Sequence, residues 1–124
     1  MKDTDVSIIN IVAREMYVIA AEHGFHSDSP LPGSGKKATV DRVSKFCSNM
    51  HGEVSELWEA ARKGKLDVPC DKEECELTCA EEELADLVIR AMDCAVVLGV
   101  DLGDAILKKS KYNAGRPFMH GKKA

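Results

Sequence analysis

Apolar residues recur at helical spacing in four stretches of the chain, and residues that commonly begin or end helices bound each stretch. The pattern predicts helices from residue 4 or 5 to 23, from 39 to about 63, from 78 to 98 and from 101 to about 113. The expected N-caps are Thr4 or Asp5, Thr39, Thr78 and Asp101, and the expected ends are Gly24, Gly64, Gly99 and Gly115. Aromatic residues and alternating β-branched runs are few. The sequence therefore predicts an all-α protein with a single domain.

The apolar positions also indicate how the helices pack. On the first helix they cover a broad face: Val6, Ile8, Ile9, Ile11, Val12, Met16, Ile19 and Ala20. This width predicts burial on more than one side, including against a second subunit. The core-facing stripes of the next two helices are Val40, Val43, Cys47, Met50, Val54, Leu57 and Ala61, with Phe46 and Trp58 at the edges, and then Leu84, Leu87, Val88, Ala91, Cys94, Ala95 and Leu98. The short connection predicts that these two helices pack antiparallel.

Three segments are expected outside the helices: loop 24–38, loop 65–78 and a loose basic tail at residues 115–124. The first loop contains Gly33-Ser34-Gly35-Lys36, which invites comparison with a phosphate-binding P-loop. Pro30 stands where the first glycine of that motif belongs, Lys37 replaces its Ser or Thr, and no strand precedes it. We interpret the segment as a solvated connection, with contact of Lys36 and Lys37 to phosphate as the alternative.

Charge and cysteine usage narrow the class of protein. The 124 residues carry a formal net charge of −4, whereas a general nucleic-acid binder presents a basic face. Acids concentrate between Asp71 and Asp86 and bases between Lys108 and Lys123, which suits a site for metal and polyanion, although two solvated faces give the same pattern. No apolar run reaches the roughly 18 residues of a membrane span. The five cysteines are odd in number and are expected to be reduced thiols in a cytoplasmic protein.

Two acidic stretches carry the clearest functional signal. Each contains two carboxylates three residues apart, Glu53 with Glu56 on the second predicted helix and Glu83 with Asp86 on the third. A helix turns about 100° per residue, so each pair lies on nearly one face. Both pairs have almost the same offset from their own apolar stripe, and antiparallel packing then predicts that all four flank one groove. One such pair alone is an ordinary feature of a helix surface.

Four carboxylates in one groove repel one another, which predicts a bound cation. Ligands that are all oxygen suit Mg²⁺, with Mn²⁺ as a second possibility. A ferritin-like di-iron centre needs a histidine three residues after a glutamate, and none of the four histidines stands there. Cys70, Cys75 and Cys79 lack the paired spacing and the fourth ligand of a structural zinc site.

The acidic pairs and the segment after them resemble a known family. That segment, Lys108-Lys109-Ser110-Lys111-Tyr112-Asn113-Ala114-Gly115-Arg116-Pro117, together with the pairs is similar to the small MazG-like all-α nucleoside triphosphate pyrophosphohydrolases over about residues 40 to 121. The resemblance implies a four-helix bundle that is active as a dimer or tetramer. It implies Mg²⁺-dependent hydrolysis of an NTP or dNTP to the monophosphate and pyrophosphate, which would keep the nucleotide pool in order. His51-Gly52 stand where many relatives carry a further acid, so the number of metal ions is left open.

The resemblance also implies roles for individual residues. Glu53, Glu56, Glu83 and Asp86 match the family's metal ligands, and of the two catalytic candidates, Glu53 and Glu56, the second is the one expected to orient or deprotonate the attacking water. Lys109, Asn113 and Arg116 match a segment that contacts phosphate and nucleotide. A catalytically silent helical module that retains metal or nucleotide binding is the alternative function.

Four further side chains are placed by the helical pattern. Trp58 either stacks on a base of the substrate or packs in the core, and its position at the edge of the stripe favours the core. His26, in loop 24–38, is expected in solvent, with contact to the nucleotide as the alternative. Arg90 and Asp93 are expected to form a pair on the surface of the third helix or at an interface.

Overall fold

The computed structural model describes residues 1–27, 31–72 and 75–121, and these residues form four α-helices and a final 3-10 turn. The elements are α1 (Asp3–Glu22), α2 (Val40–Arg62), α3 (Cys79–Leu98), α4 (Leu102–Ala114) and η1 (Phe118–Gly121). Within the described ranges β pairing is limited to one isolated antiparallel bridge between Pro69 and Thr78. The predicted all-α class is therefore confirmed. None of the helices in these ranges combines the length and apolar character needed to cross a membrane.

Three of the predicted N-caps are confirmed by side-chain hydrogen bonds. The hydroxyl of Thr39 accepts from the backbone N–H of Arg42 at 3.1 Å at the start of α2. Thr78 accepts from the N–H of Glu81 at 3.2 Å and donates its own N–H to the Glu81 carboxylate at 2.9 Å. This reciprocal pair satisfies two of the backbone donors that the first turn of α3 leaves open. The Asp101 carboxylate accepts the N–H of Asp104 at 2.9 Å at the start of α4.

The two chain ends depart from the prediction. Helix α1 begins at Asp3, with Lys2 as its N-cap, rather than after Thr4 or Asp5. The Asp5 carboxylate instead accepts the N–H of Lys2 at 2.7 Å from inside the first turn, where negative charge is also favourable. At the other end, residues 118–121 form a 3-10 turn instead of a loose tail, and the rest of the predicted tail, 122–124, lies outside the described residues.

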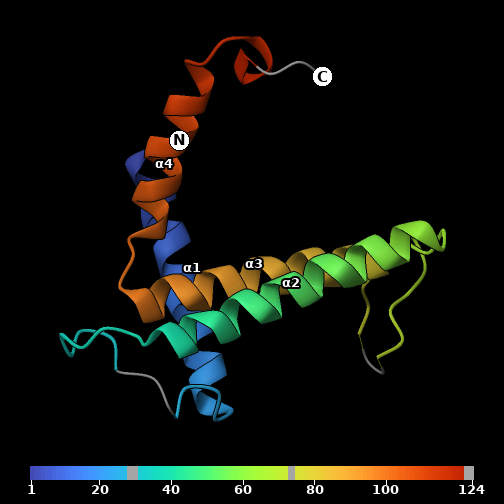
Figure 1. Ribbon diagram of the computed structural model, residues 1–124, viewed down its shortest axis with the longest axis horizontal. Coiled ribbons are helices and arrows are strands. Elements are labelled where there is room, and N and C mark those ends of the chain that lie inside the picture. Colours follow the sequence, from blue (N-terminus) through green and yellow to red (C-terminus); the bar gives the residue numbers. More distant parts are fainter. Residues whose placement is uncertain (28–30, 73–74, 122–124) are drawn as a thin grey trace.

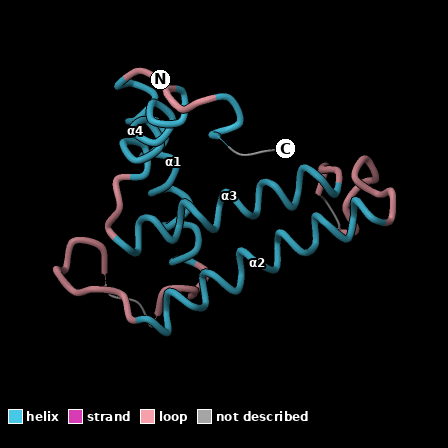
Figure 2. The backbone as a smooth tube through the Cα atoms, turned by 45° about the horizontal axis from the view of Figure 1, so that its top comes forward, coloured by secondary structure: helices cyan, strands magenta, loops and turns pink. Residues whose placement is uncertain are grey.

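The helices form two pairs that cross each other. Helices α2 and α3 run antiparallel and side by side, as predicted (Figures 1 and 2). Helix α1 crosses this pair and packs on α3, and α4 lies along α1. In Figure 1 the outer half of α4 extends away from the α2–α3 pair. One chain therefore forms an open arrangement of four helices rather than a closed bundle.

This open arrangement leaves the core small. Phe46, Cys94 and Val97 are buried together, with Tyr17 and Met50 packed around them. Other apolar residues that the sequence places in the core are not covered. On α2, Val54 and Trp58 are 48% and 64% exposed, and on α3, Leu84 and Val88 are each 50% exposed. Val40, Cys47 and Leu98 are also exposed. The contacts within one chain therefore do not bury Trp58 or the full stripes, which the helical pattern placed facing a core.

The four exposed residues share one face of the α2–α3 pair. Val54 and Trp58 stand one and five residues after Glu53, and Leu84 and Val88 stand one and five residues after Glu83. Equal offsets on two antiparallel helices place all four on one side, about 100° to 140° around each helix from its glutamate. We call these four residues the apolar face. It lies on the opposite side of the helix pair from the carboxylates.

Helix α4 is attached to α1 by a close backbone contact at Gly103. The N–H of Gly103 donates to the side chain of Asn10 at 2.9 Å, and Asn10 donates to Asp101 at 2.8 Å. A Cβ atom on Gly103 would overlap the backbone carbonyl of Val6. The glycine is therefore what lets the two helices approach so closely.

We expect Gly103→Ala to lower the free energy of unfolding by about 2 kcal/mol, because the added methyl group forces backbone apart rather than a flexible side chain. Urea denaturation measures the change. Gly52→Ala is the matched control, since Gly52 is also helical but has no atom within 4 Å of the position that its Cβ would take. That control should be stabilised by about 1 kcal/mol. Equal behaviour of the two variants would contradict the close contact.

Candidate metal centre and the adjoining pocket

Three carboxylates from α2 and α3 converge on one point. One oxygen from each of Glu53, Glu56 and Glu83 lies within 4.8 Å of the others. In the described part of the chain, no other group of three or more His, Cys, Asp or Glu side chains meets in this way. We call these residues the three-carboxylate cluster. The structure thus brings together three of the four expected ligands, while Asp86 lies beside the cluster rather than in it.

Glu53 is held in place by an arginine from the facing helix. It is buried, and Arg90 Nε donates to its Oε1 at 2.8 Å. Burial alone would raise the pKa of Glu53, but the hydrogen bonds from Arg90 and from the neighbouring carboxyl groups hold it below its ordinary value. Arg90 and Asp93 were expected to pair with each other. Arg90 instead bonds Glu53, and Asp93 bonds His26.

Glu83 is the member of the cluster whose charged form is disfavoured. Burial, followed by the nearby Glu56 and Glu53, raises its pKa to about 8. Its Oε2 atom is buried and has no hydrogen-bond partner among the residues that the structure describes. Burial and the charge of Glu53 also raise the pKa of Asp86, against the opposing charges of Lys72 and Arg90. At neutral pH the cluster therefore retains a proton that a divalent cation would displace.

The residues present fit a hard divalent cation. The donors are carboxylate oxygens, which Mg²⁺ and Mn²⁺ prefer and which suit soft metals poorly. Glu83 Oε2 makes no hydrogen bond within the described part of the chain, and an unpaired buried polar atom is costly. Glu56 is exposed and so can complete the coordination from the solvent side. Glu53, Glu56 and Glu83 would hold the ion, with Asp86 next to them.

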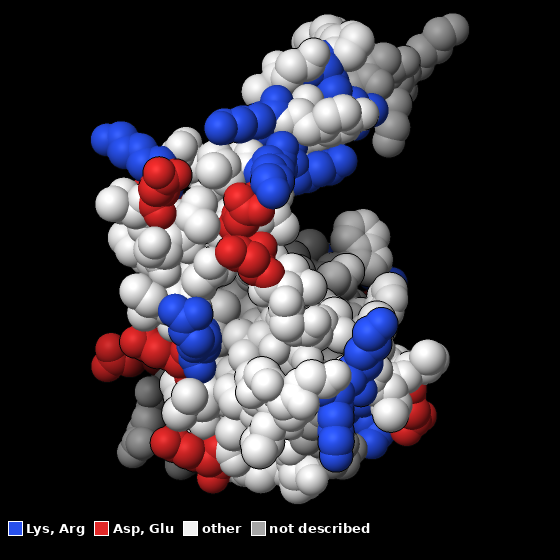
Figure 3. Space-filling model, turned by 90° about the vertical axis from the view of Figure 1, so that its left-hand side faces the viewer, with Lys and Arg blue, Asp and Glu red and all other residues white. Residues whose placement is uncertain are grey.

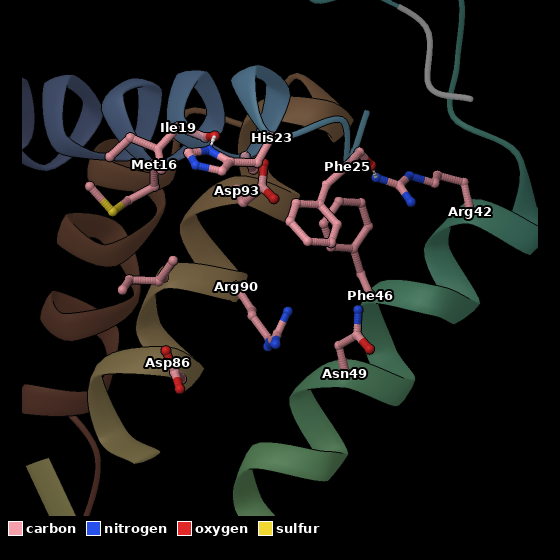
Figure 4. Close-up of a pocket in the computed structure, with 12 residues that line it drawn as sticks. Met16, Ile19, His23, Phe25, Arg42, Phe46, Asn49, Asp86, Arg90 and Asp93 are labelled. Atoms are coloured by element: carbon pink, nitrogen blue, oxygen red, sulfur yellow. Dashed lines mark hydrogen bonds between the residues drawn. The ribbon is translucent and has the colours of Figure 1, made fainter. Parts of the chain in front are cut away.

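A pocket of about 430 Å³ adjoins the cluster, between α1, α2 and α3 (Figure 4). Met16 and Ile19 of α1 and Phe46 of α2 supply apolar walls, and Asn49 and Arg90 supply polar groups. In Figure 4 the side chain of Arg90 extends from α3 toward α2. Arg90 therefore connects the pocket with the cluster, since it lines the one and bonds Glu53 of the other. We call this the α1 pocket, and its volume is typical of small-molecule sites.

A buried polar network closes one end of the α1 pocket. His26 Nε2 and Asp93 Oδ1 are 2.6 Å apart, and Arg42 Nη2 donates to His26 Nδ1 at 2.9 Å and to the carbonyl of Phe25 at 2.6 Å. Because Arg42 can only donate, Nε2 carries the hydrogen that His26 gives to Asp93. The His26 ring also stacks on Tyr17, with centroids 4.5 Å apart.

The expectation that His26 is in solvent is wrong, and sequence reasoning missed this network. The available signal was the position of Asp93, which stands seven residues after Asp86 and so on the same face of α3 as the predicted groove. The network fastens the turn after α1 to the other two helices of the pocket, which fixes the shape of that wall.

The expected nucleotide-contacting residues of the C-terminal segment lie elsewhere in the chain. Lys109 and Arg116 both stand over the ring of Tyr112, at 4.6 and 5.5 Å from its centroid. Figure 3 shows Lys and Arg side chains gathered over the outer part of α4, which points away from the α2–α3 pair. Neither these residues nor Asn113 line the α1 pocket. Trp58 does not line it either, and is about 140° around α2 from Glu53.

Two other candidates from the sequence lie apart from the cluster. Lys36 and Lys37 adjoin residues 96–99 at the end of α3, about 20 Å along that helix from Glu83. The five cysteines are free thiols. Cys70 donates to the carbonyl of Cys75 at 3.6 Å, and the three loop cysteines do not form a metal-binding group in the described part of the chain.

Comparison of the chain with protein-family models, with curated proteins and with solved structures found no match. The family resemblance therefore stays a prediction.

Proposed function

We propose that the protein is a Mg²⁺-dependent pyrophosphohydrolase that cleaves a nucleoside or deoxynucleoside triphosphate to the monophosphate and pyrophosphate, with a role in nucleotide-pool housecleaning in the cytoplasm. The observation that carries the proposal is the meeting of Glu53, Glu56 and Glu83, with an unsatisfied Glu83 oxygen, beside a pocket large enough for a nucleoside. Carboxylates beside an apolar pocket suit a ligand that is polyanionic at one end and aromatic at the other.

The residues divide the work as follows. The nucleoside occupies the α1 pocket, and Arg90 at its inner edge donates to the phosphate nearest the nucleoside. Mg²⁺ held by Glu53, Glu56 and Glu83 would neutralise charge on the phosphate oxygens and activate water for attack. Glu56 is the exposed member of the cluster and takes the proton from the attacking water. The water oxygen forms the new P–O bond as the bond between the α and β phosphates breaks, and pyrophosphate leaves with the bridging oxygen.

The test is a panel of NTPs and dNTPs incubated with the purified protein and Mg²⁺ or Mn²⁺. We expect release of pyrophosphate and the nucleoside monophosphate, without orthophosphate, and loss of turnover in a chelator. Absence of turnover over the whole panel with both metals would overturn the proposal and favour the catalytically silent module. Release of orthophosphate would overturn the assigned bond.

A second copy of the chain completes this proposal. The apolar face of α2 and α3 is uncovered in one chain, and large exposed apolar patches mark interaction surfaces. Lys109 and Arg116 lie on a helix that leaves the cluster of its own chain, so in a dimer or tetramer they are available to the phosphates bound by another copy. The assignment of a substrate role to Lys109, Asn113 and Arg116 therefore depends on assembly.

We expect Trp58→Asp to reduce the molecular mass in solution to that of a single chain, because it places a charge in the centre of the apolar face. Size-exclusion chromatography with light scattering measures the mass. Ser48→Asp adds the same charge to an exposed position of α2 outside this face and should leave the mass unchanged. If Ile11→Asp dissociates the protein and Trp58→Asp does not, the interface lies on α1 instead.

A further inference from the structure

A second hollow of about 560 Å³ adjoins the three-carboxylate cluster, on the side toward loop 65–78. Glu56 and Glu83 line it, and so do three lysines, Lys63, Lys65 and Lys72. We call it the loop hollow. It includes none of the α1 and α2 residues that line the α1 pocket, so the cluster lies between two separate cavities along the α2–α3 pair. One cavity is largely apolar, and the other is lined by charged side chains.

Backbone hydrogen bonds fix the loop that carries these lysines. Lys65 N–H donates to the carbonyl of Ala60 at 2.8 Å, which holds Lys65 at the end of α2. Farther on, Cys70 N–H donates to Leu77 and Cys79 N–H donates to Val68, each at 2.8 Å. The described parts of the loop are therefore tied to each other and to the start of α3. Lysines presented from such a framework lose less freedom when a ligand binds.

The three lysines differ in their partners. Lys72 pairs with the buried Glu82, and Lys63 Nζ lies 3.3 Å from Glu59 on an exposed part of α2. Within the described residues Lys65 makes no ion pair. Its ammonium group is thus the one at this hollow that can bind an anion without giving up a carboxylate. The hydrogen bond and charge of Glu82 raise the pKa of Lys72 above its usual range, so Lys72 stays charged as well.

On the basis of the proposed function, we propose that the loop hollow binds the pyrophosphate end of the triphosphate, with Lys65 as its main protein contact and Lys63 and Lys72 at its rim. The substrate then lies along the α2–α3 pair, with its base in the α1 pocket and its terminal phosphates beside the loop. The bond that breaks lies over the three-carboxylate cluster. The same hollow holds the product pyrophosphate before release. Because carboxylates outnumber lysines here, binding requires the divalent cation.

The test is calorimetric titration of the whole protein with inorganic pyrophosphate, which needs no turnover. We expect binding in Mg²⁺, none in a chelator, and an affinity about tenfold weaker in Lys65→Gln, as for loss of one charged hydrogen bond. Lys37→Gln removes an exposed lysine that precedes α2 and lies beside the far end of α3. This variant should bind pyrophosphate as the wild type does. In steady-state assays Lys65→Gln should raise KM for the triphosphate with little change in kcat, while competition by the nucleoside monophosphate is unchanged.

The outcomes separate this proposal from the proposed function. If pyrophosphate binding depends on Lys65 but the protein hydrolyses no nucleotide, the loop hollow is supported as a pyrophosphate site and the proposed reaction is contradicted. If the protein hydrolyses a nucleotide but Lys65→Gln and wild type have the same pyrophosphate affinity and the same KM, the proposed reaction is supported. The assignment of the loop hollow as the pyrophosphate site is then contradicted. Absence of pyrophosphate binding to the wild type in Mg²⁺ also overturns the hollow. A thermal melt of Lys65→Gln that matches the wild type shows that these differences do not arise from misfolding.

Discussion

Replacing Glu83 with glutamine is expected to lower the rate of hydrolysis by about 100-fold or more. The same change is expected to make the metal-free protein more stable. The loss of activity follows because Glu83→Gln removes one of three oxygen ligands and the charge that neutralises a cation. The gain in stability follows because Glu83 is held among Glu53 and Glu56, where its charged form is disfavoured. Glutamine keeps the shape of the side chain without the charge. Pyrophosphate release and the melting temperature in a chelator measure the two effects.

The pH dependence of stability isolates the same residue. The carboxyl of Glu83 ionises near 4.5 in an unfolded chain and near 8 in the folded protein. Between these values the folded state holds the extra proton, so the free energy of unfolding contributed by Glu83 falls as pH rises from about 4.5 to about 8. Above that range the loss is complete. Glu83→Gln should remove this part of the pH dependence.

Mg²⁺ should reverse the order of stability. The wild type gains stability from the ion at pH 8, and its Mg²⁺ affinity should increase by up to tenfold per pH unit as pH rises toward 8, because one proton must leave. Glu15→Gln, on the exposed surface of α1, is the control and should change neither activity nor this dependence. A Glu83→Gln protein with wild-type activity at limiting Mg²⁺ would remove Glu83 from the metal site.

The helices and their ends were predictable because their causes are local. Thr39 and Thr78 cap helices through hydrogen bonds within three residues, and Gly99 takes the left-handed conformation that ends α3. The convergence of Glu53, Glu56 and Glu83 was predictable for a related reason. Helical period and a short antiparallel connection together fix which faces meet, so the spacing of the glutamates along the sequence was enough to predict that they converge.

The remaining features depend on contacts that periodicity does not encode. An apolar stripe shows which residues avoid water but not which partner covers them, so Trp58 could be placed at a stripe edge and still lie exposed in one chain. Asp86 shares a face with Glu83 but stays outside the cluster, and helical spacing alone does not encode which side chains of that face converge. The loop fold that buries His26 depends on residues far apart in sequence, and the position of Asp93 on the face of Asp86 does not by itself show that the loop meets it.

Removing the carboxylate of Asp93 is expected to give the largest loss of stability among single polar substitutions. Asp93→Ala leaves Nε2 of His26, whose side chain is 3% exposed, without its acceptor, and also removes a charge that faces Arg42. Breaking a buried ionic network of this kind costs about 3 kcal/mol. Urea denaturation should show this loss, and KM for the triphosphate should rise because Phe25 and Arg42 no longer hold the wall of the α1 pocket.

Two companion variants separate the network from general effects of charge. Asp67→Ala removes an exposed aspartate from the loop after α2 and should change stability by less than about 0.5 kcal/mol. Asp93→Asn keeps an oxygen that can accept from His26 Nε2, so it should retain more stability than Asp93→Ala while still losing the charge. If Asp93→Ala is no less stable than Asp67→Ala, the bond to His26 does not hold the turn after α1. Packing around the core cluster of Phe46, which Tyr17 contacts, would then hold this part of the protein without the polar network.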